Sequence, residues 1–278
     1  RAFRTDYVPS EIVTESYLRL GADLQNYLGS GQAFQSDIPF IVLDTFGQGI
    51  DASDFKNIAF ELYEPTSAGP ASFADDPTLQ SRAGLKVRGS SSSGFSKRPY
   101  ALELREDYSD DDDAKALLGM EAESDWVLHG PYVFDRTFTH NAFIFELSQQ
   151  LGVDAMDTRF IEVFNNQDGG ELTYGDYFGV YVLIEKIKRD AGRVDVQKLS
   201  PQYSTEPEIS GGYVLKIDRA DPGDTGFNAG GQTWRYVDPK EIEIEQNPLQ
   251  QAYITQYINE FWAALSSSTF THPTTGQP

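Results

Sequence analysis

The 278-residue chain contains no cysteine, which excludes a disulfide scaffold, a thiolate zinc site and a cysteine nucleophile. No apolar run approaches the ~18 residues of a membrane-spanning helix. Positive charge is also scarce, because 22 Lys and Arg face 43 Asp and Glu, and the formal net charge is −21. A negative field of that size disfavours binding to nucleic acid or to an anionic membrane. We therefore expect neither a nucleic-acid partner nor a membrane span.

The chain is nevertheless rich enough in apolar residues to fold, at 39% hydrophobic and 13% aromatic. Amphipathic stretches predict a helix over 135–151, with Asp135 as N-cap and Gly152 as C-terminal cap, and a second helix after Asn247. Strands come first and are then interspersed with helices, without a βαβ rhythm, which predicts an α+β fold in one continuous domain. Apolar and alternating runs predict strands at 36–45, 56–63, 85–88, 100–104, 159–164, 178–184 and 212–217.

Acidic and histidine residues give weaker signals. The run 110–113 precedes an apolar stretch, which favours capping of a helix over 114–118, since the spacing of an EF-hand calcium loop is absent. The segment 221–224 is typical of a turn. His129, His140 and His272 are scattered, and their spacing does not indicate a zinc site.

The most informative stretch is 77–102, which contains no Asp or Glu although the chain is strongly acidic. It predicts two strands joined by a Gly/Ser-rich loop, whose backbone N–H groups, hydroxyls and cations suit phosphate oxygens and would attract an anion such as ATP. The loop is not a P-loop, a GxGxxG turn or a nucleophile elbow, so a flexible surface hairpin stays an alternative. Its five basic residues are Arg82, Lys86, Arg88, Lys97 and Arg98.

Two further charged residues lie within or directly after apolar strands. Glu185 ends the run 178–184, and Lys216 lies inside the strand 212–217. A Glu and a Lys from central strands could pair and position phosphates, as they do in a kinase N-lobe. Each could equally be part of a structural ion pair. Lys216 could also bury its aliphatic chain while its ammonium stays exposed to solvent.

Five segments in order resemble the signature motifs of the spore-coat protein H (CotH) kinase family. The resemblance covers roughly residues 36–265. Three details depart from the family pattern: Arg98 replaces a second Lys, His140 replaces an Arg, and the loop 167–176 is longer than usual. The segments are LKVRGSSSSGFSKRPY at 85–100, LGMEAESDW at 118–126, GPY and the following residues at 130–141, FGVYVLIEKI at 178–187 and GGYVLKID at 211–218.

The resemblance implies an atypical protein-kinase-like (CotH-type) N-lobe and middle portion at 81–278, preceded by a β-rich extension at 1–80. It implies transfer of the γ-phosphoryl group of ATP, with Mg²⁺ or Mn²⁺, to Ser or Thr of secreted or surface proteins, at an extracellular or bacterial cell-surface location. The residues that match the nucleotide-facing loop and the family's acid and lysine are Arg88, Ser90, Ser91, Lys97, Glu185 and Lys216.

Two later family elements, which carry the proposed catalytic and metal-binding aspartates, are not found in this sequence. We therefore expect a fragment that binds nucleotide weakly and does not turn it over, with its catalytic residues beyond Pro278 and no metal ligand assigned. The alternative is a non-catalytic extracellular surface or adhesion module, which the acidic composition and the 15 tyrosines would suit.

Overall fold

The computed structural model describes residues 18–220, 225–272 and 274–276, so the turn expected at 221–224 lies outside the described residues. The chain divides into two compact units, Arg1–Lys186 and Ile187–Pro278. The sequence showed no linker where these units meet. The boundary expected after residue 80 falls within strand β5 (Leu79–Val87). Each unit is described below by itself.

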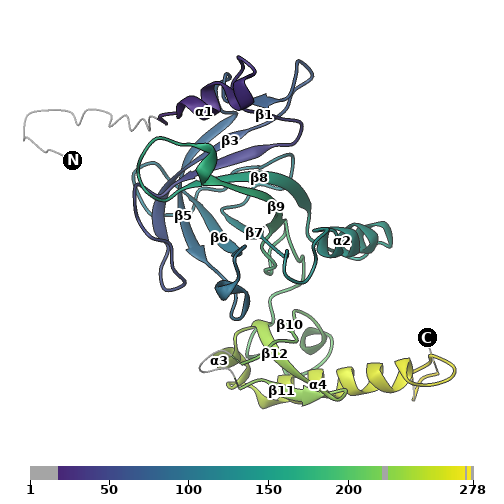
Figure 1. The fold of residues 1–278 in the computed structure, drawn as a ribbon. Coiled ribbons are helices and arrows are strands. Elements are labelled where there is room, and N and C mark those ends of the chain that lie inside the picture. The colour runs from purple at the N-terminus through teal and green to yellow at the C-terminus, as the bar shows by residue number, and fades with distance from the viewer. Residues whose placement is uncertain (1–17, 221–224, 273, 277–278) are drawn as a thin grey trace, which may run out of the picture. The chain divides into compact units, whose positions relative to one another are not determined.

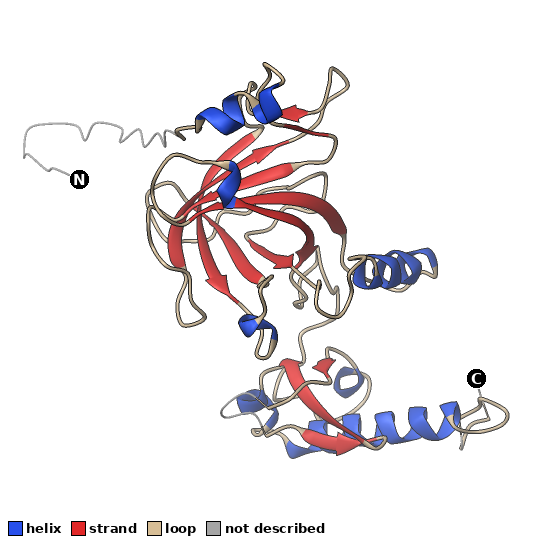
Figure 2. Ribbon diagram, viewed as in Figure 1, coloured by secondary structure: helices blue, strands red, loops and turns tan. Residues whose placement is uncertain are grey.

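The first unit is built around a closed β-barrel of seven strands from the described chain (Figures 1 and 2). Neighbouring strands are antiparallel except β2 and β8, which pair in parallel and close the barrel. The expected α+β class is therefore confirmed. In spatial order the strands are β2 (Phe40–Asp44), β3 (Lys56–Tyr63), β5 (Leu79–Val87), β6 (Tyr100–Arg105), β7 (Asp125–His129), β9 (Tyr177–Glu185) and β8 (Thr158–Asn166).

The apolar run of β2 is continuous because both of its faces are buried. Ile41 and Leu43 point into the barrel core, whereas Phe40 and Val42 join a second, aromatic cluster on the other face. Leu24 of α1 (Ala22–Gln25) and Ala71 of β4 (Ala71–Ser72) belong to this second cluster. Strand β4 pairs with β1 (Gln35–Ser36), which directly follows Phe34 of the same cluster.

Helix α2 (His140–Gln150) begins later than the predicted start at Asp135. Phe138 has φ = +63°, a left-handed conformation that cannot continue an α-helix toward the N-terminus. Asp135 still serves the helix start, because its carboxylate accepts a hydrogen bond from the backbone N–H of His140 at 2.8 Å. Gly152, with φ = +76°, follows the last turn as predicted.

The helix expected at 114–118 is wrong, because that stretch forms turns and an isolated bridge from Lys115 to Glu123. The preceding acidic residues pair with cations instead of capping a helix. Asp110 lies 3.0 Å from Arg82 and 3.5 Å from Arg105, and Asp113 pairs with Lys115. Basic side chains of the barrel strands thus hold the run against the sheet.

The second unit contains a small antiparallel sheet and a long helix. Helix α4 (Pro248–Leu265) starts as predicted, since Asn247 accepts a hydrogen bond from the N–H of Leu249 and Pro248 occupies the first helical position. Ile254 and Ile258 of α4 pack with Phe227 of the sheet. The other elements are β10 (Val214–Lys216), β12 (Gln232–Asp238) and β11 (Phe227–Ala229), in that spatial order, and the short helix α3 (Glu241–Ile244).

Candidate functional site

The loop between β5 and β6 is a structured turn. Its neck is closed by the last ladder pair, Val87 with Tyr100, and by a hydrogen bond from the N–H of Arg88 to the carbonyl of Pro99 at 3.0 Å. Gly89 has φ = +82°, and a Cβ there would lie 2.1 Å from the hydroxyl of Ser92. The sequence therefore needs glycine at this position to turn the chain back on itself.

The loop presents polar groups that the described protein does not use. Arg88 is an exposed residue, and within the described ranges its guanidinium makes no hydrogen bond or ion pair. Desolvation by the surrounding protein lowers the pKa of Arg88, but an arginine stays charged at neutral pH. Ser90 and Ser91 are exposed beside it, while Ser93 donates its hydroxyl proton to the carbonyl of Ser90 at 2.7 Å.

Lys97 lies at the base of the loop and is docked on β9. Its ammonium donates a hydrogen bond to the carbonyl oxygen of Phe178 at 2.6 Å, and it lies 4.1 Å from the ring centre of Tyr181 and 5.6 Å from that of Phe138. Across the described parts of the chain, no carboxylate pairs with it. Desolvation therefore lowers the pKa of Lys97 to about 8.

The structure adds His129, Asp135 and His140 to this end of the barrel. His129 ends β7, and burial, then the positive charge of Arg88, lower its pKa, while Asp135 acts in the opposite direction. Asp135 is 5% exposed and lies 3.8 Å from the Nδ1 atom of His140. Desolvation acts to raise the pKa of Asp135, but hydrogen bonds from Thr137 and His140 outweigh it and lower the pKa to about 2.

From the sequence alone, His129 and His140 are scattered, because no metal-ligand spacing relates them. The signal available was their place in the motif at 130–141, since His129 directly precedes Gly130 and both Asp135 and His140 lie within it. The link to the loop is His129, because the charge of Arg88 lowers its pKa, while Asp135 lies near both His129 and His140.

Glu185 and Lys216, which the sequence suggested as a pair, lie in different compact units. Glu185 ends β9 and is 5% exposed, and its carboxylate accepts a hydrogen bond from the N–H of Asp157 at 2.9 Å. That bond joins the end of β9 to the segment that enters β8. Lys216 ends β10 in the second unit. Their pairing stays a prediction.

Comparison with protein families decides what kind of domain this is. The family model described as CotH kinase protein matches residues 85–274, which is more than two thirds of the chain. The chain belongs to the CotH kinase protein family. A search of curated proteins found no match. The matched region of this CotH kinase domain begins in β5, so β2 and β3 precede it in sequence although they complete the same barrel.

The family implies use of ATP with a divalent metal. The loop fits the phosphates of such a ligand, because it combines an uncommitted guanidinium with hydroxyls and a nearby lysine. For the metal, no group of three or more His, Asp or Glu arranged to hold an ion occurs among the residues that the structure describes. Within the same residues, no helix is long and apolar enough to cross a membrane.

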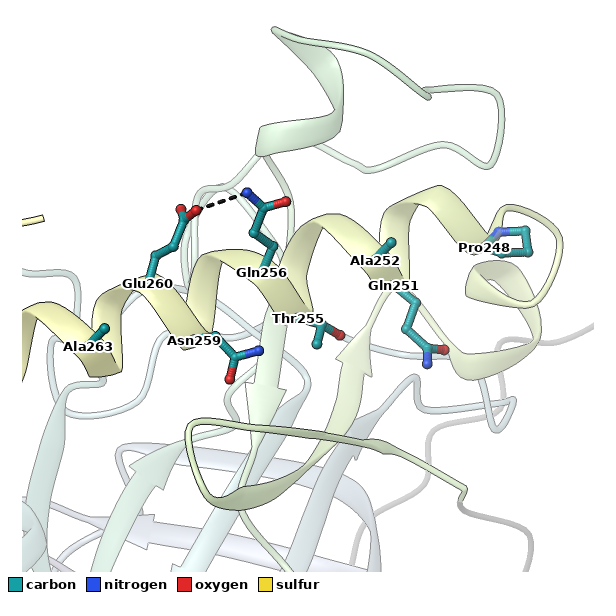
Figure 3. A pocket seen from close by; sticks show the side chains of 8 residues that line it. All are labelled: Pro248, Gln251, Ala252, Thr255, Gln256, Asn259, Glu260 and Ala263. Atoms are coloured by element: carbon teal, nitrogen blue, oxygen red, sulfur yellow. Dashed lines mark hydrogen bonds between the residues drawn. The ribbon is translucent and has the colours of Figure 1, made fainter. Parts of the chain in front are cut away.

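A hollow of about 680 Å³ follows one face of α4 in the CotH kinase domain (Figure 3). Among the described residues that line it, Glu260 is the only charged one. Its carboxylate accepts a hydrogen bond from Gln256 at 2.9 Å, and Figure 3 marks this bond with a dashed line. A carboxylate and side-chain amides do not favour an anionic ligand. The β5–β6 loop is therefore the better candidate for nucleotide phosphates.

Proposed function

We propose that this chain is the nucleotide-binding part of a CotH-type protein kinase, which uses ATP to phosphorylate Ser or Thr of secreted or surface proteins. The observation that carries the proposal is the Arg88 guanidinium, which has no protein partner among the described residues and lies in a structured loop inside the family match. A protein of net charge −21 that presents cations on one turn concentrates an anion there.

Each loop residue then has a role that follows from its chemistry. The Arg88 guanidinium binds phosphate oxygens in a two-pronged manner, and the hydroxyls of Ser90 and Ser91 donate further hydrogen bonds. Lys97 adds positive potential from the base of the loop while its bond to Phe178 fixes the loop on β9. When bound, ATP supplies the phosphoryl group and its metal ion neutralises phosphate charge.

The finer fold assignment belongs to the same proposal. Strands β5 to β9 with α2 correspond to a kinase-like N-lobe, and the strands before β5 correspond to the β-rich extension. In support, the Gly/Ser turn, the segment 130–141 that leads into α2, then β9 and β10 follow one another in the order that the family motifs have. The location we propose is extracellular or at a bacterial cell surface, as implied by the family resemblance.

A thermal-shift titration with ATP and Mg²⁺ or Mn²⁺ tests nucleotide binding. We expect ATP to raise Tm in the wild type, as any ligand selective for the folded state does. The shift should be lost in Arg88→Ala and Lys97→Ala. Arg19→Ala is the matched control, because Arg19 pairs with Glu171 outside the loop. No shift in the wild type with any nucleotide, or an equal shift in all variants, would contradict the proposal.

Phosphoryl transfer needs its own assay. The protein extended by its natural continuation, if one exists, is incubated with labelled ATP, either metal and a Ser-rich protein. We expect label on the substrate or on the kinase itself. Absence of transfer with both metals would remove the kinase activity from the proposal, while leaving nucleotide binding to be judged by the thermal shift.

The second candidate is a non-catalytic surface or adhesion module. It is favoured by apolar side chains that α2 and α4 leave exposed, such as Phe143 at 66% and Phe261 at 55%. This candidate predicts binding to a glycan or protein partner without any nucleotide-dependent shift. The same titration, followed by a binding screen, separates the two.

A further inference from the structure

Two hollows of the barrel unit share Phe46 as a lining residue. Their volumes are about 340 and 330 Å³, within the size range of small-molecule sites. Phe46 is 58% exposed, so its ring is available to a ligand. Besides Phe46, the polar residues Asn57, Gln80, Arg82 and Asp107 line the first hollow, and Arg19 and Asp44 line the second.

The backbone around Phe46 is fixed. Its N–H donates a hydrogen bond to the Asp44 carboxylate at 2.8 Å, and the N–H of Thr45 donates one to the carbonyl of Asn166 at 3.0 Å. Phe46 itself has φ = +53°, a left-handed conformation that is uncommon for a bulky residue. An exposed ring gains little from burial to offset that strain. The fold therefore holds an aromatic ring at the surface, beside two polar hollows, without an evident gain in stability.

The polar side chains of the first hollow are held by the barrel and keep hydrogen-bonding capacity. The amide oxygen of Asn57 accepts a bond from Arg105 at 2.7 Å, which leaves its amide N–H groups without a partner among the described residues. Gln80 donates to Glu61 at 3.0 Å, and its amide oxygen accepts nothing from the described chain. Asp107 is exposed, and its carboxylate has no partner within the same ranges. The hollow thus offers donors and acceptors in fixed positions.

The positive charge that lines these hollows is already paired, which disfavours an anionic ligand. Arg82 donates to two backbone carbonyls and lies 3.0 Å from Asp110. Arg19 lies 2.5 Å from Glu171. An extended peptide is disfavoured as well, because β3 and β5 each pair with a strand on both sides and leave no edge for strand addition.

We propose that Phe46 and the two hollows bind an uncharged glycan, with one sugar ring stacked on Phe46. A sugar ring has a C–H face that packs on an aromatic ring, and a rim of hydroxyls that each donate and accept hydrogen bonds. The amide of Asn57 and the carboxylate of Asp107 match that rim. Two hollows that share one ring fit two consecutive sugar units. None of these residues belongs to the β5–β6 loop, so this site does not rest on nucleotide binding.

Saturation-transfer difference NMR on the full chain, without nucleotide, tests this site. The probes are cellobiose, maltose, lactose and N,N′-diacetylchitobiose, each at about 10 mM, because single sugar sites bind weakly. N-acetyl tetraalanine amide is the peptide probe. We expect at least one disaccharide to receive saturation, most strongly at its ring C–H protons, and the peptide to receive none.

Three variants assign the binding to this site, with circular dichroism confirming each fold. Phe46→Ala should weaken binding of that disaccharide about tenfold. Asp107→Ala, which breaks no hydrogen bond within the described chain, should weaken it about threefold. Phe143→Ala is the matched control and should leave it unchanged, because Phe143 is an exposed phenylalanine of α2 that lines neither hollow. The proposal is overturned if no disaccharide binds, if the peptide binds in their place, or if Phe46→Ala binds like the wild type.

Discussion

Lys97 and Phe178 join two segments that lie far apart in the sequence, through a hydrogen bond of 2.6 Å from the lysine ammonium to the phenylalanine carbonyl oxygen. The bond fastens the β5–β6 loop to the first half of β9. It also means that the lysine which the motif suggests for phosphate binding already has a structural partner. Arg88 is a cation of the loop whose side chain makes no hydrogen bond or ion pair among the described residues.

The conformation of Gly89 should be essential for the loop. Gly89→Ala places a Cβ at a positive φ and close to the Ser92 hydroxyl, so we expect it to lower the free energy of unfolding by about 1–2 kcal/mol. Gly94→Ala is the matched control, because a Cβ there meets nothing within 4 Å, and it should change stability by less than about 0.5 kcal/mol. Urea denaturation of both variants measures this, and equal effects would refute the role of Gly89.

The pKa of Lys97 should make stability depend on pH in the mildly alkaline range. Its pKa falls from 10.5 to about 8 on folding, so the unfolded chain binds more protons between these values. Stability contributed by this group is therefore lowest below pH 8 and increases as the pH rises above it. We expect the wild type to gain stability relative to Lys97→Met between pH 7 and about 9.5, below the ionisation of ordinary tyrosines. A difference that stays flat, or falls, would contradict this.

Asp135 should make stability depend on pH in the acidic range. Desolvation opposes its ionisation, but hydrogen bonds from Thr137 and His140 lower its pKa from 3.8 to about 2. Its contribution to stability is present above pH 3.8 and is lost as the pH falls toward 2. Compared with Asp135→Asn by urea denaturation, the wild type should lose its advantage in that window. An advantage that persists unchanged at pH 2 would show that the carboxylate is not the group involved.

Local sequence patterns predicted most of the barrel strands but missed β7, β11 and β12, and they predicted longer-range structure poorly. The strand 56–63 is β3 with the same bounds, because its alternation records one buried face. Closure of the barrel was not predictable, since β2 pairs in parallel with β8 more than a hundred residues later and nothing local encodes that register. The late start of α2 depends on the left-handed Phe138, a conformation that apolar spacing does not reveal.

In the candidate site, too, local composition was informative, whereas the three-dimensional contacts were not predictable. Composition alone located the loop, because a basic stretch without acids is unusual in this chain. It could not show that Lys97 turns toward Phe178 while Arg88 does not pair within the described chain, since both are simply cations in the sequence. Nor could it bring His129 and Asp135 together, because their proximity depends on the turn between β7 and α2.

Hydrogen–deuterium exchange with and without ATP tests the central claim, that the β5–β6 loop binds nucleotide phosphates, most directly. The backbone N–H groups of residues 88–97 should exchange more slowly when ATP is added with Mg²⁺ or Mn²⁺, and Arg88→Ala should abolish that protection. Exchange at the loop that ATP leaves unchanged, in a sample where ATP binding is detected by another method, would contradict the account.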